Sequence, residues 1–475
     1  MKNIPRLLAY FTLPLFLLSE TLYAQERLKV TEPDVTRMPL LSRLASIDSR
    51  KDSIYIVYAS PKEKEALQQA HFRFESYPDD VASKALSMAN SLGEMSQWNR
   101  YPTYSVYLQM MQHFASEYPS LCCIDTIGTS VQGRLILCAR LTSQQLPDSM
   151  KPQFFYSSTI HGDELTGFPL MLRLIDTLLA GYGNNSQYTH LLDSLQVYIN
   201  PLANPDGTYY SSNDAVGGSQ RYNANYVDLN RNYPDPFGTA PLDEQQPENT
   251  AMIAYFQTHR FRLSANLHGG TEVLNYPWDS FESSEHRHPS DAWWQRICAK
   301  FIDTLRACQN DITMTNELQR GYIEGGDWYV IRNGRQDWVN AKMDCLEMTM
   351  EISIPKRLSS SLLPTYWEAY QHPFVNYIKC ALRDTVFLSD SSSDDPLEIG
   401  VADAFSVSRL FIYPNPSNGH ITLSGTSQHP VELLDVYGRH LERFPAGTTE
   451  LYFHQPSGIY ILRCGKRQTV LLLNQ

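Results

Sequence analysis

The sequence lacks the features that mark nucleic-acid-binding, multi-span membrane and disulfide-framework proteins. Its 475 residues carry a formal net charge of −12 with no long basic run, which argues against nucleic-acid binding. Beyond the N-terminus, no segment stays apolar over the roughly 20 residues that a membrane-spanning helix needs. The eight cysteines form neither a CxxC pair nor a regular framework. We therefore expect buried thiols with one or two disulfides at most.

Residues 1–24 have the pattern of a secretory signal peptide. Lys2 and Arg6 supply positive charge, and residues 7–18 are apolar. This run is short for a transmembrane helix. We expect cleavage after Ala24, with a nearby site or an uncleaved anchor as the alternatives.

Residues 25–100 form a polar, mixed segment, in which 53–58 predict a strand and 61–70 a helix. We interpret this segment as a small α+β propeptide-like or accessory region.

Strands and helices alternate over residues 101–385. Strands are predicted at 135–141, 154–159, 197–200, 263–267 and 345–352, and helices at 103–118, 165–180, 247–259, 290–308 and 364–382. This alternation predicts an α/β domain, with a mostly parallel or mixed β-sheet. Ligands of such sheets bind where loops leave the strand ends.

The remaining residues divide into a polar linker at 386–402, rich in Ser and Asp, and an all-β region at 403–475. Short strands are predicted at 410–413, 420–423, 431–436, 451–453, 459–463 and 469–473. We expect a small all-β sandwich domain.

Two predicted strands of the α/β domain end in histidines. The strand at 154–159 leads into His161 and Glu164, three positions apart, and the strand at 263–267 leads into His268. Two histidines and one glutamate form a catalytic zinc set that leaves one coordination position open for water. The His-x-x-Glu pair alone would be weak evidence.

Other polar residues supply what a zinc hydrolase needs beside the metal. The strand at 345–352 places Glu347 and Glu351 on one face, and strand geometry does not decide which of them is a general base. Arg221, Asn230 and Arg231 offer donors for a free carboxylate. Any one of these arginines could equally be a solvated surface charge.

Seven segments, in order, resemble the zinc metallocarboxypeptidases, and within them the carboxypeptidase N/E-like subfamily. The segments are 161–164, 200–207, 221–225, 228–234, 267–270 with 275–277, 336–338 and 347–353. The resemblance implies a mixed β-sheet with helices on both faces and one Zn²⁺ per chain.

The resemblance also implies roles for the residues. His161, Glu164 and His268 match the zinc ligands, and Glu351 matches the catalytic glutamate that acts as general base and acid. Arg221 matches the arginine that stabilises the oxyanion. Asn230 and Arg231 match the pair that binds the terminal carboxylate, and Tyr329 matches a mobile tyrosine that closes over the substrate.

Gln336 and Asp291 stand where the resemblance suggests specificity residues. Gln336 matches a residue at the pocket floor, and Asp291 falls near the position of an acidic residue that receives a basic side chain. We therefore expect release of C-terminal Lys or Arg. The neighbours Ser290 and Ala292 depart from the acidic residues usual there.

Residues 405–475 resemble the C-terminal sorting domain of the type IX secretion system, which belongs to Bacteroidota. The segments that carry this resemblance are 413–419, 433–439 and 457–462. It implies a secreted or outer-membrane-surface protein that first reaches the periplasm. A plain β-sandwich accessory domain is the alternative.

The sequence therefore predicts a secreted zinc carboxypeptidase that acts on peptide or protein C-termini. A zinc amidase or deacylase acting on cell-wall peptides or acyl amino acids is the second hypothesis, and an inactive binding module is the third. The carboxylate-binding residues argue against the second, and the complete set of ligands argues against the third. We expect a monomer whose partners include the type IX secretion machinery but no nucleic acid.

Overall fold

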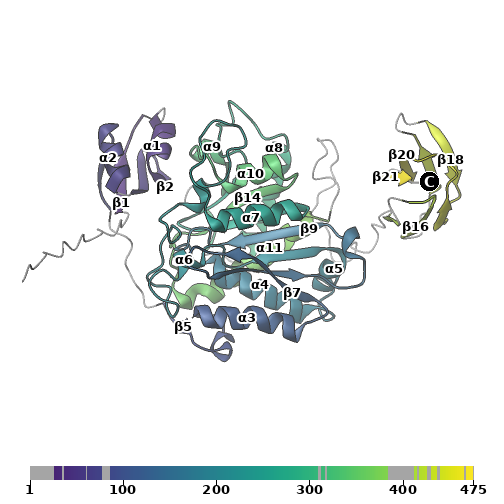
Figure 1. Ribbon diagram of the computed structural model, residues 1–475, viewed down its shortest axis with the longest axis horizontal. Coiled ribbons are helices and arrows are strands. Elements are labelled where there is room, and N and C mark those ends of the chain that lie inside the picture. Colours follow the sequence, from purple (N-terminus) through teal and green to yellow (C-terminus); the bar gives the residue numbers. More distant parts are fainter. Residues whose placement is uncertain are drawn as a thin grey trace, which may run out of the picture. The chain divides into compact units, whose positions relative to one another are not determined.

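The computed structural model describes most of the chain. The described residues are 26–34, 37–59, 61–77, 86–308, 312–315, 318–382, 411–413, 417–424, 429–435, 439–464 and 467–473. The predicted signal peptide (1–24) and linker (386–402) lie outside them. The chain divides into two compact units, Met1–Ser392 and Ser393–Gln475. We name residues 26–77 the N-terminal subdomain, 86–382 the central body and 411–473 the C-terminal domain (Figure 1).

The N-terminal subdomain is a four-stranded antiparallel sheet with two helices. Its elements are β1 (Glu26–Thr31), α1 (Met38–Leu44), β2 (Ser46–Lys51), β3 (Ile54–Ala59), α2 (Pro61–Gln69) and β4 (Arg73–Ser76), in the strand order β2-β3-β1-β4. The predicted strand and helix correspond to β3 and α2. Alternate residues of β3, Tyr55 and Val57, are fully buried with Leu41 and Leu67 of the two helices.

The central body contains an eight-stranded mixed sheet with the order β13-β12-β14-β11-β9-β10-β8-β7. Its strands are β7 (Cys122–Thr129), β8 (Leu135–Leu141), β9 (Gln153–Ser158), β10 (Gln196–Asn200), β11 (Phe261–His268), β12 (Thr271–Tyr276), β13 (Tyr322–Glu324) and β14 (Leu346–Ser353). The inner strands β10, β9, β11 and β14 are parallel to one another. Strands β8 and β12 pair antiparallel with this group, which confirms the predicted mixed sheet.

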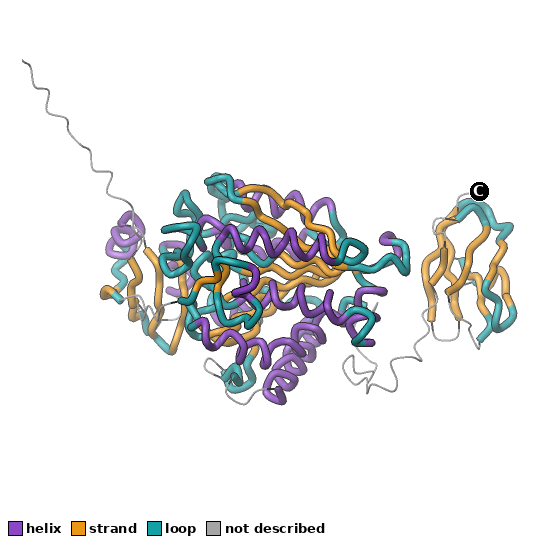
Figure 2. The backbone as a smooth tube through the Cα atoms, turned by 90° about the horizontal axis from the view of Figure 1, so that it is seen from below, coloured by secondary structure: helices purple, strands orange, loops and turns teal. Residues whose placement is uncertain are grey.

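Helices cover both faces of this sheet (Figures 1 and 2). They are α3 (Tyr104–Glu117), α4 (Gly167–Gly181), α5 (Ser186–Ser194), α6 (Pro205–Thr208), α7 (Pro247–Thr258), α8 (Asp291–Cys308), α9 (Gly325–Trp328), α10 (Arg335–Lys342) and α11 (Leu363–Cys380). Short elements include β5 (Met88–Ala89), β6 (Tyr101–Pro102) and 3-10 turns at Leu92–Met95, Asp148–Met150, Leu229–Arg231 and Ser360–Leu362.

Strand β9 shows how the two faces are formed. The Phe155 ring packs edge-on against Phe256 of α7, with centroids 5.2 Å apart. The next residue, Tyr156, points to the other face, where its hydroxyl donates to the Phe374 carbonyl of α11 at 3.1 Å. Because successive side chains of a strand point to opposite faces, a continuous apolar run lets β9 pack under both helical layers.

The parallel strands bring the predicted ligands to one edge of the sheet. β9 ends just before His161, and β11 ends at His268. β14 pairs in parallel with β11 in a register that sets His268 opposite Glu351. The carboxyl ends of neighbouring parallel strands meet at one edge, so residues far apart in the sequence converge there.

The C-terminal domain is a small β-sandwich, as predicted. Its strands are β15 (Phe411–Tyr413), β16 (His420–Ser424), β17 (Val431–Leu434), β18 (His440–Phe444), β19 (Glu450–Tyr452), β20 (Gly458–Cys464) and β21 (Arg467–Leu473). They form two sheets, β15-β16-β19 and β18-β17-β20-β21. Ile421 and Leu451 of the first sheet share one core with Val431 and Leu462 of the second.

The eight cysteines are free thiols, six of them buried. Burial raises the pKa of Cys122 to about 12, so this thiol stays protonated and unreactive at neutral pH. The structure thus favours buried thiols over the one or two disulfides that the sequence allowed.

Candidate active site

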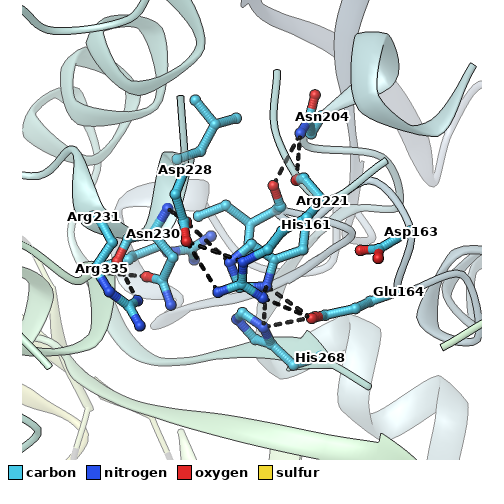
Figure 3. Close-up of polar contacts among 12 residues, drawn as sticks. His161, Asp163, Glu164, Asn204, Arg221, Asp228, Asn230, Arg231, His268 and Arg335 are labelled. Carbon is cyan, nitrogen blue, oxygen red and sulfur yellow. Dashed lines mark hydrogen bonds and ion pairs between the residues drawn. The ribbon is translucent and has the colours of Figure 1, made fainter. Parts of the chain in front are cut away.

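Three buried side chains converge at the edge of the sheet. The Nδ1 atom of His161 lies 2.9 Å from Glu164 Oε1, and the Nδ1 atom of His268 lies 2.8 Å from Glu164 Oε2. The two Nδ1 atoms are 3.1 Å apart (Figure 3). One ligand atom from each residue lies within 4.8 Å of the others, which is close enough for all three to bind one metal ion.

The loop that carries His161 and Glu164 is fixed by its neighbours. The Gly162 N–H donates to the Arg221 carbonyl at 3.1 Å, and the Thr208 hydroxyl donates to the Gly162 carbonyl at 3.0 Å. A Cβ atom at Gly162 would lie 2.3 Å from the Gly207 carbonyl carbon, so glycine alone permits this approach. The quoted segment 200–207 therefore supports the ligand loop.

Each histidine uses its second ring nitrogen to contact a supporting polar group. His161 Nε2 lies 3.1 Å from Asp228 Oδ1, and His268 Nε2 lies 2.8 Å from the Asn266 amide nitrogen. The Asn266 side-chain oxygen has no hydrogen-bond partner among the described residues. If the amide is turned by 180°, this oxygen takes the place of the nitrogen and accepts a hydrogen bond from His268 Nε2–H. The Nδ1 atoms of both histidines face Glu164, and Arg221 Nη1 also lies 3.1 Å from His161 Nδ1. This orientation from behind is typical of histidines that bind a metal.

The charges in the site suit a divalent cation. Burial alone would raise the pKa of Glu164, but electrostatic interactions with the neighbouring His161, Lys356 and His268 side chains outweigh it and hold this pKa well below its usual value. Burial lowers the pKa of His268 to about 4. An ionised carboxylate and a neutral imidazole are the protonation states that bind metal, and this donor set fits zinc.

Asp228 positions both His161 and Arg221. Its Oδ2 atom accepts from Arg221 Nε at 3.1 Å and pairs with Nη2 at 3.0 Å, while its Oδ1 atom contacts His161. Burial would raise the pKa of Asp228, but Arg221 and His161 hold it well below its usual value. Sequence reasoning gave this residue no role, although it opens the quoted segment 228–234.

Asn230 and Arg231 lie on the 3-10 turn Leu229–Arg231, next to the candidate metal ligands (Figure 3). The Asn230 backbone N–H donates to Asp228 Oδ1 at 2.9 Å. Arg231 Nη1 donates to the Asn230 carbonyl at 3.0 Å. The Arg231 Nε and Nη2 atoms have no hydrogen-bond partner among the described residues, so two N–H donors remain for a ligand.

One pocket joins the residues expected in the catalytic site. It is lined by His161, Glu164, Arg221, Asn230, Arg231, His268, Asn275, Asp279, Tyr329, Ile331, Thr349 and Glu351. Glu351 faces this pocket, whereas Glu347 is fully buried against Arg335 at 2.8 Å. The structure thus separates the two glutamates that strand alternation could not.

The predicted specificity residues have different positions. Gln336 supports the pocket from behind, because its Nε2 donates to Asp279 Oδ1 at 2.9 Å. Asp291 does not line the pocket, since the chain has turned away to the start of α8, where its carboxylate binds Arg287 at 3.2 Å and Gln295 at 2.9 Å. Besides Glu164 and Glu351, the acidic residue that lines the pocket is Asp279, which is 3% exposed.

Asp279 is a pocket residue that the sequence motifs did not single out. It stands two positions after the quoted segment 275–277, so a signal was available. Burial, and next the Asp337 carboxylate, raise the pKa of Asp279 well above its usual value, against the hydrogen bond from Asn275 and the charge of Arg231.

Tyr329 and Ile331 form a pocket wall that the N-terminal subdomain covers. Both belong to the same hydrophobic cluster as the core of that subdomain. The Tyr58 hydroxyl donates to Asp163 Oδ2 at 3.4 Å, and its ring packs edge-on against Tyr222, with centroids 6.4 Å apart. The subdomain therefore lies against the residues that surround the candidate metal site.

The fold and the His-Glu-His site define a metal-dependent hydrolase of the α/β class. The model of the zinc carboxypeptidase family matches residues 107–372, and the chain belongs to this family.

Relatives of known name share the central body. The chain is 33% identical over 279 residues to carboxypeptidase D of Anas platyrhynchos, which covers 57% of this chain and 20% of that protein. It is 33% identical over 285 residues to carboxypeptidase M of Mus musculus, covering 57% and 63% of the two chains. The chain thus spans only about a fifth of the length of the carboxypeptidase D relative.

Solved structures share the fold at low sequence identity. The thrombin activatable fibrinolysis inhibitor aligns with a TM-score of 0.58 and 14% identity, covering 76% of this chain and 99% of that one. Carboxypeptidase A from Helicoverpa armigera aligns with the same TM-score and 17% identity, covering 76% and 98%. The shared fold includes more of the chain than residues 107–372.

Proposed function

We propose that this protein hydrolyses the C-terminal peptide bond of peptides and proteins. The observation that carries the proposal is the position of the two unpartnered Arg231 donors in the pocket that also contains the His-Glu-His cluster. A guanidinium binds a carboxylate through paired N–H donors. An enzyme that removes terminal residues needs such a group close to its reacting centre.

The pocket residues divide the chemical tasks. Arg231 and Asn230 bind the terminal carboxylate, and Arg221 stabilises negative charge on the carbonyl oxygen. Glu351 takes a proton from water and returns it to the leaving amine. When bound by His161, Glu164 and His268, zinc supplies Lewis acidity, which lowers the pKa of water and polarises a carbonyl oxygen.

We propose that the released residue is Lys or Arg. Asp279, a buried carboxyl in the pocket wall, supplies the charge that a basic side chain needs. Gln336 fixes Asp279 Oδ1, and the backbone N–H groups of Asp279 and Ser280 donate to Asp337, each at 2.8 Å. A fixed carboxylate attracts the cation of a basic side chain, and that cation in turn favours the ionised form of Asp279.

Hydrolysis of three blocked dipeptides tests this function. Hippuryl-arginine and hippuryl-lysine should be cleaved with a kcat/KM at least about 10-fold above that of hippuryl-phenylalanine. Absence of cleavage of all three would sink the peptidase proposal. Equal cleavage of all three would remove only the basic preference. Cleavage of an acyl amide without a free carboxylate at a comparable rate would favour the amidase alternative.

We also propose that the N-terminal subdomain acts as a propeptide. Its core continues into the pocket wall through Tyr329 and Ile331, and Tyr58 reaches Asp163, the neighbour of the candidate ligand Glu164. A substrate could then enter the pocket only when the subdomain leaves this wall. Release of the subdomain would therefore increase the fraction of molecules that can bind substrate.

Cutting the chain after the subdomain should activate the enzyme. With a protease recognition sequence placed between residues 77 and 86, cleavage should raise kcat/KM for hippuryl-arginine about 10-fold if a tenth of the uncut molecules are competent. The matched control carries the same sequence near residue 393, between the two compact units, and should show no change. Equal activity before and after the first cut would contradict the proposal.

Export is a further part of the proposal. Within the described ranges, no helix has both the length and the apolar character needed to cross a membrane. The C-terminal domain has its own core, which suits a sorting domain that is removed after type IX export. The intact mass of the chain recovered outside the cells tests this, since retention of residues 403–475 there would argue against removal.

A further inference from the structure

Helix α10 begins with three residues that hold two parts of the pocket wall, one at Asn230 and one at Asp279. The Arg335 backbone N–H donates to Asn230 Oδ1 at 2.9 Å, and Gln336 Nε2 donates to Asp279 Oδ1 at 2.9 Å. The Asp337 carboxylate accepts the backbone N–H groups of Asp279 and Ser280. The residues proposed to bind the terminal carboxylate and the basic side chain thus depend on one helical turn.

The same helix is tied to β14, the strand that carries Glu351. The Thr349 N–H donates to Gln336 Oε1 at 2.7 Å. The Asn340 amide donates to the Glu347 carbonyl at 2.8 Å and accepts the Glu347 N–H at 3.2 Å. Strand β12 pairs with β14 only from Thr349 to Ser353. Before Thr349, the backbone of β14 is hydrogen-bonded by the Asn340 side chain of α10 instead.

A buried ion pair joins α10 to β14 at the same place. Arg335 Nη2 lies 2.8 Å from Glu347 Oε2, and the two side chains are 1% and 0% exposed. The guanidinium lies over the rings of Phe155 and Phe256, 5.3 Å and 5.2 Å from their centroids. Figure 3 shows Arg335 beside Asn230 and Arg231.

This ion pair has few hydrogen bonds for its degree of burial. Ser264 Oγ also donates to Glu347 Oε2, at 2.8 Å. However, Arg335 Nε, Arg335 Nη1 and Glu347 Oε1 have no hydrogen-bond partner among the described residues. Because both charges lose their hydration, such a pair adds little stability and can often be replaced by uncharged groups without loss. Stability therefore does not explain why two charges lie here.

We infer that the Arg335–Glu347 pair is a positioning device for substrate binding. It fixes the first turn of α10 against β14 and so sets Asn230 and Asp279 in register with Glu351, although neither charged residue lines the pocket. The inference rests on the proposed carboxypeptidase function. It makes Arg335 and Glu347 positioning residues for affinity, without a part in the chemical step.

The double substitution R335M/E347Q tests this inference because it removes both charges and keeps an acceptor for Ser264. The variant should fold with an unchanged or raised Tm and the same zinc content. Its KM for hippuryl-arginine should rise about 10-fold while kcat stays within about twofold. R335K, which keeps a cation beside Glu347, should restore most of the affinity.

Two further variants keep the test decisive. R140M removes the ion pair between Arg140 of β8 and Asp148, whose side chains are 30% and 52% exposed, and it should leave both constants unchanged.

N340A removes two hydrogen bonds between α10 and β14 without exposing a buried charge, and it should raise KM about threefold even if the double variant does not accumulate. Unchanged KM in folded R335M/E347Q, or in N340A when that variant alone is obtained, would overturn the inference. Loss of the proposed function itself would show separately, as wild-type protein that does not cleave hippuryl-arginine.

Discussion

Replacing Glu351 by glutamine should leave a folded, zinc-containing protein that turns over about 10²- to 10⁴-fold more slowly, the range expected when a general base is removed. Glutamine has the size of glutamate and keeps a hydrogen-bonding side chain, but it cannot accept a proton from water at neutral pH. The position of Glu351 in the pocket, opposite His268 in the β11–β14 register, makes it the group placed to do so.

The matched comparison separates the metal from the proton transfer. His268→Ala should lose both zinc and activity, because it removes one of the three converging ligands. Metal analysis of the purified variants, beside hippuryl-arginine hydrolysis, distinguishes the two outcomes. Normal turnover by the zinc-loaded Glu351→Gln protein would remove Glu351 from the mechanism.

Asp279→Asn should change which residue is released. We expect kcat/KM for hippuryl-arginine to fall about 100-fold, since leaving a buried charge without its partner costs about 3 kcal/mol and each 1.4 kcal/mol is about tenfold. Hippuryl-phenylalanine, which brings no charge to Asp279, should be cleaved within about threefold of the wild-type rate. Steady-state kinetics with both substrates give the ratio.

The pH dependence should follow the same carboxyl. Burial and the Asp337 carboxylate raise the pKa of Asp279, so falling pH protonates it early and removes the charge that attracts a basic side chain. KM for hippuryl-arginine should therefore rise on acidification in the wild type but not in Asp279→Asn, when each is compared with hippuryl-phenylalanine at the same pH. Asp291→Asn is the control, because its carboxylate binds Arg287 and Gln295 instead. Loss of arginine preference in that variant would contradict the assignment.

Much of the central body could be predicted from the sequence because its inner strands are long apolar runs. The strands predicted at 135–141 and 345–352 lie within one residue of β8 and β14. Strands β7, β12 and β13 were missed. Every residue of β12 is buried, including Glu272, whose pKa burial raises to about 7, so no alternation of polar and apolar residues marks it. β13 has three residues, too few to show any period.

The candidate metal ligands could be predicted because each lies at or soon after a strand end and falls in a short motif. The hydrogen bonds that support the pocket around these ligands could not be predicted. Asn230 and Arg335 are 105 positions apart, and Gln336 and Asp279 are 57 apart. A hydrogen bond between such residues depends on how loops and a short helix fold over the sheet, and no periodicity records it. Asp291 was chosen for its place near a family position, whereas the fold turns the chain away from the pocket before α8.

The hydrophobic cluster shared by the N-terminal subdomain and the pocket wall has a thermodynamic consequence. Tyr329 and Ile331 contribute to both, so the free energy that holds the subdomain and the free energy that orders the wall are linked. Linkage of this kind is reciprocal. A ligand that shifts Tyr329 weakens the packing of the subdomain against the wall. A partner that binds the subdomain changes the affinity of the pocket for that ligand, by the same factor as the ligand changes the affinity for the partner.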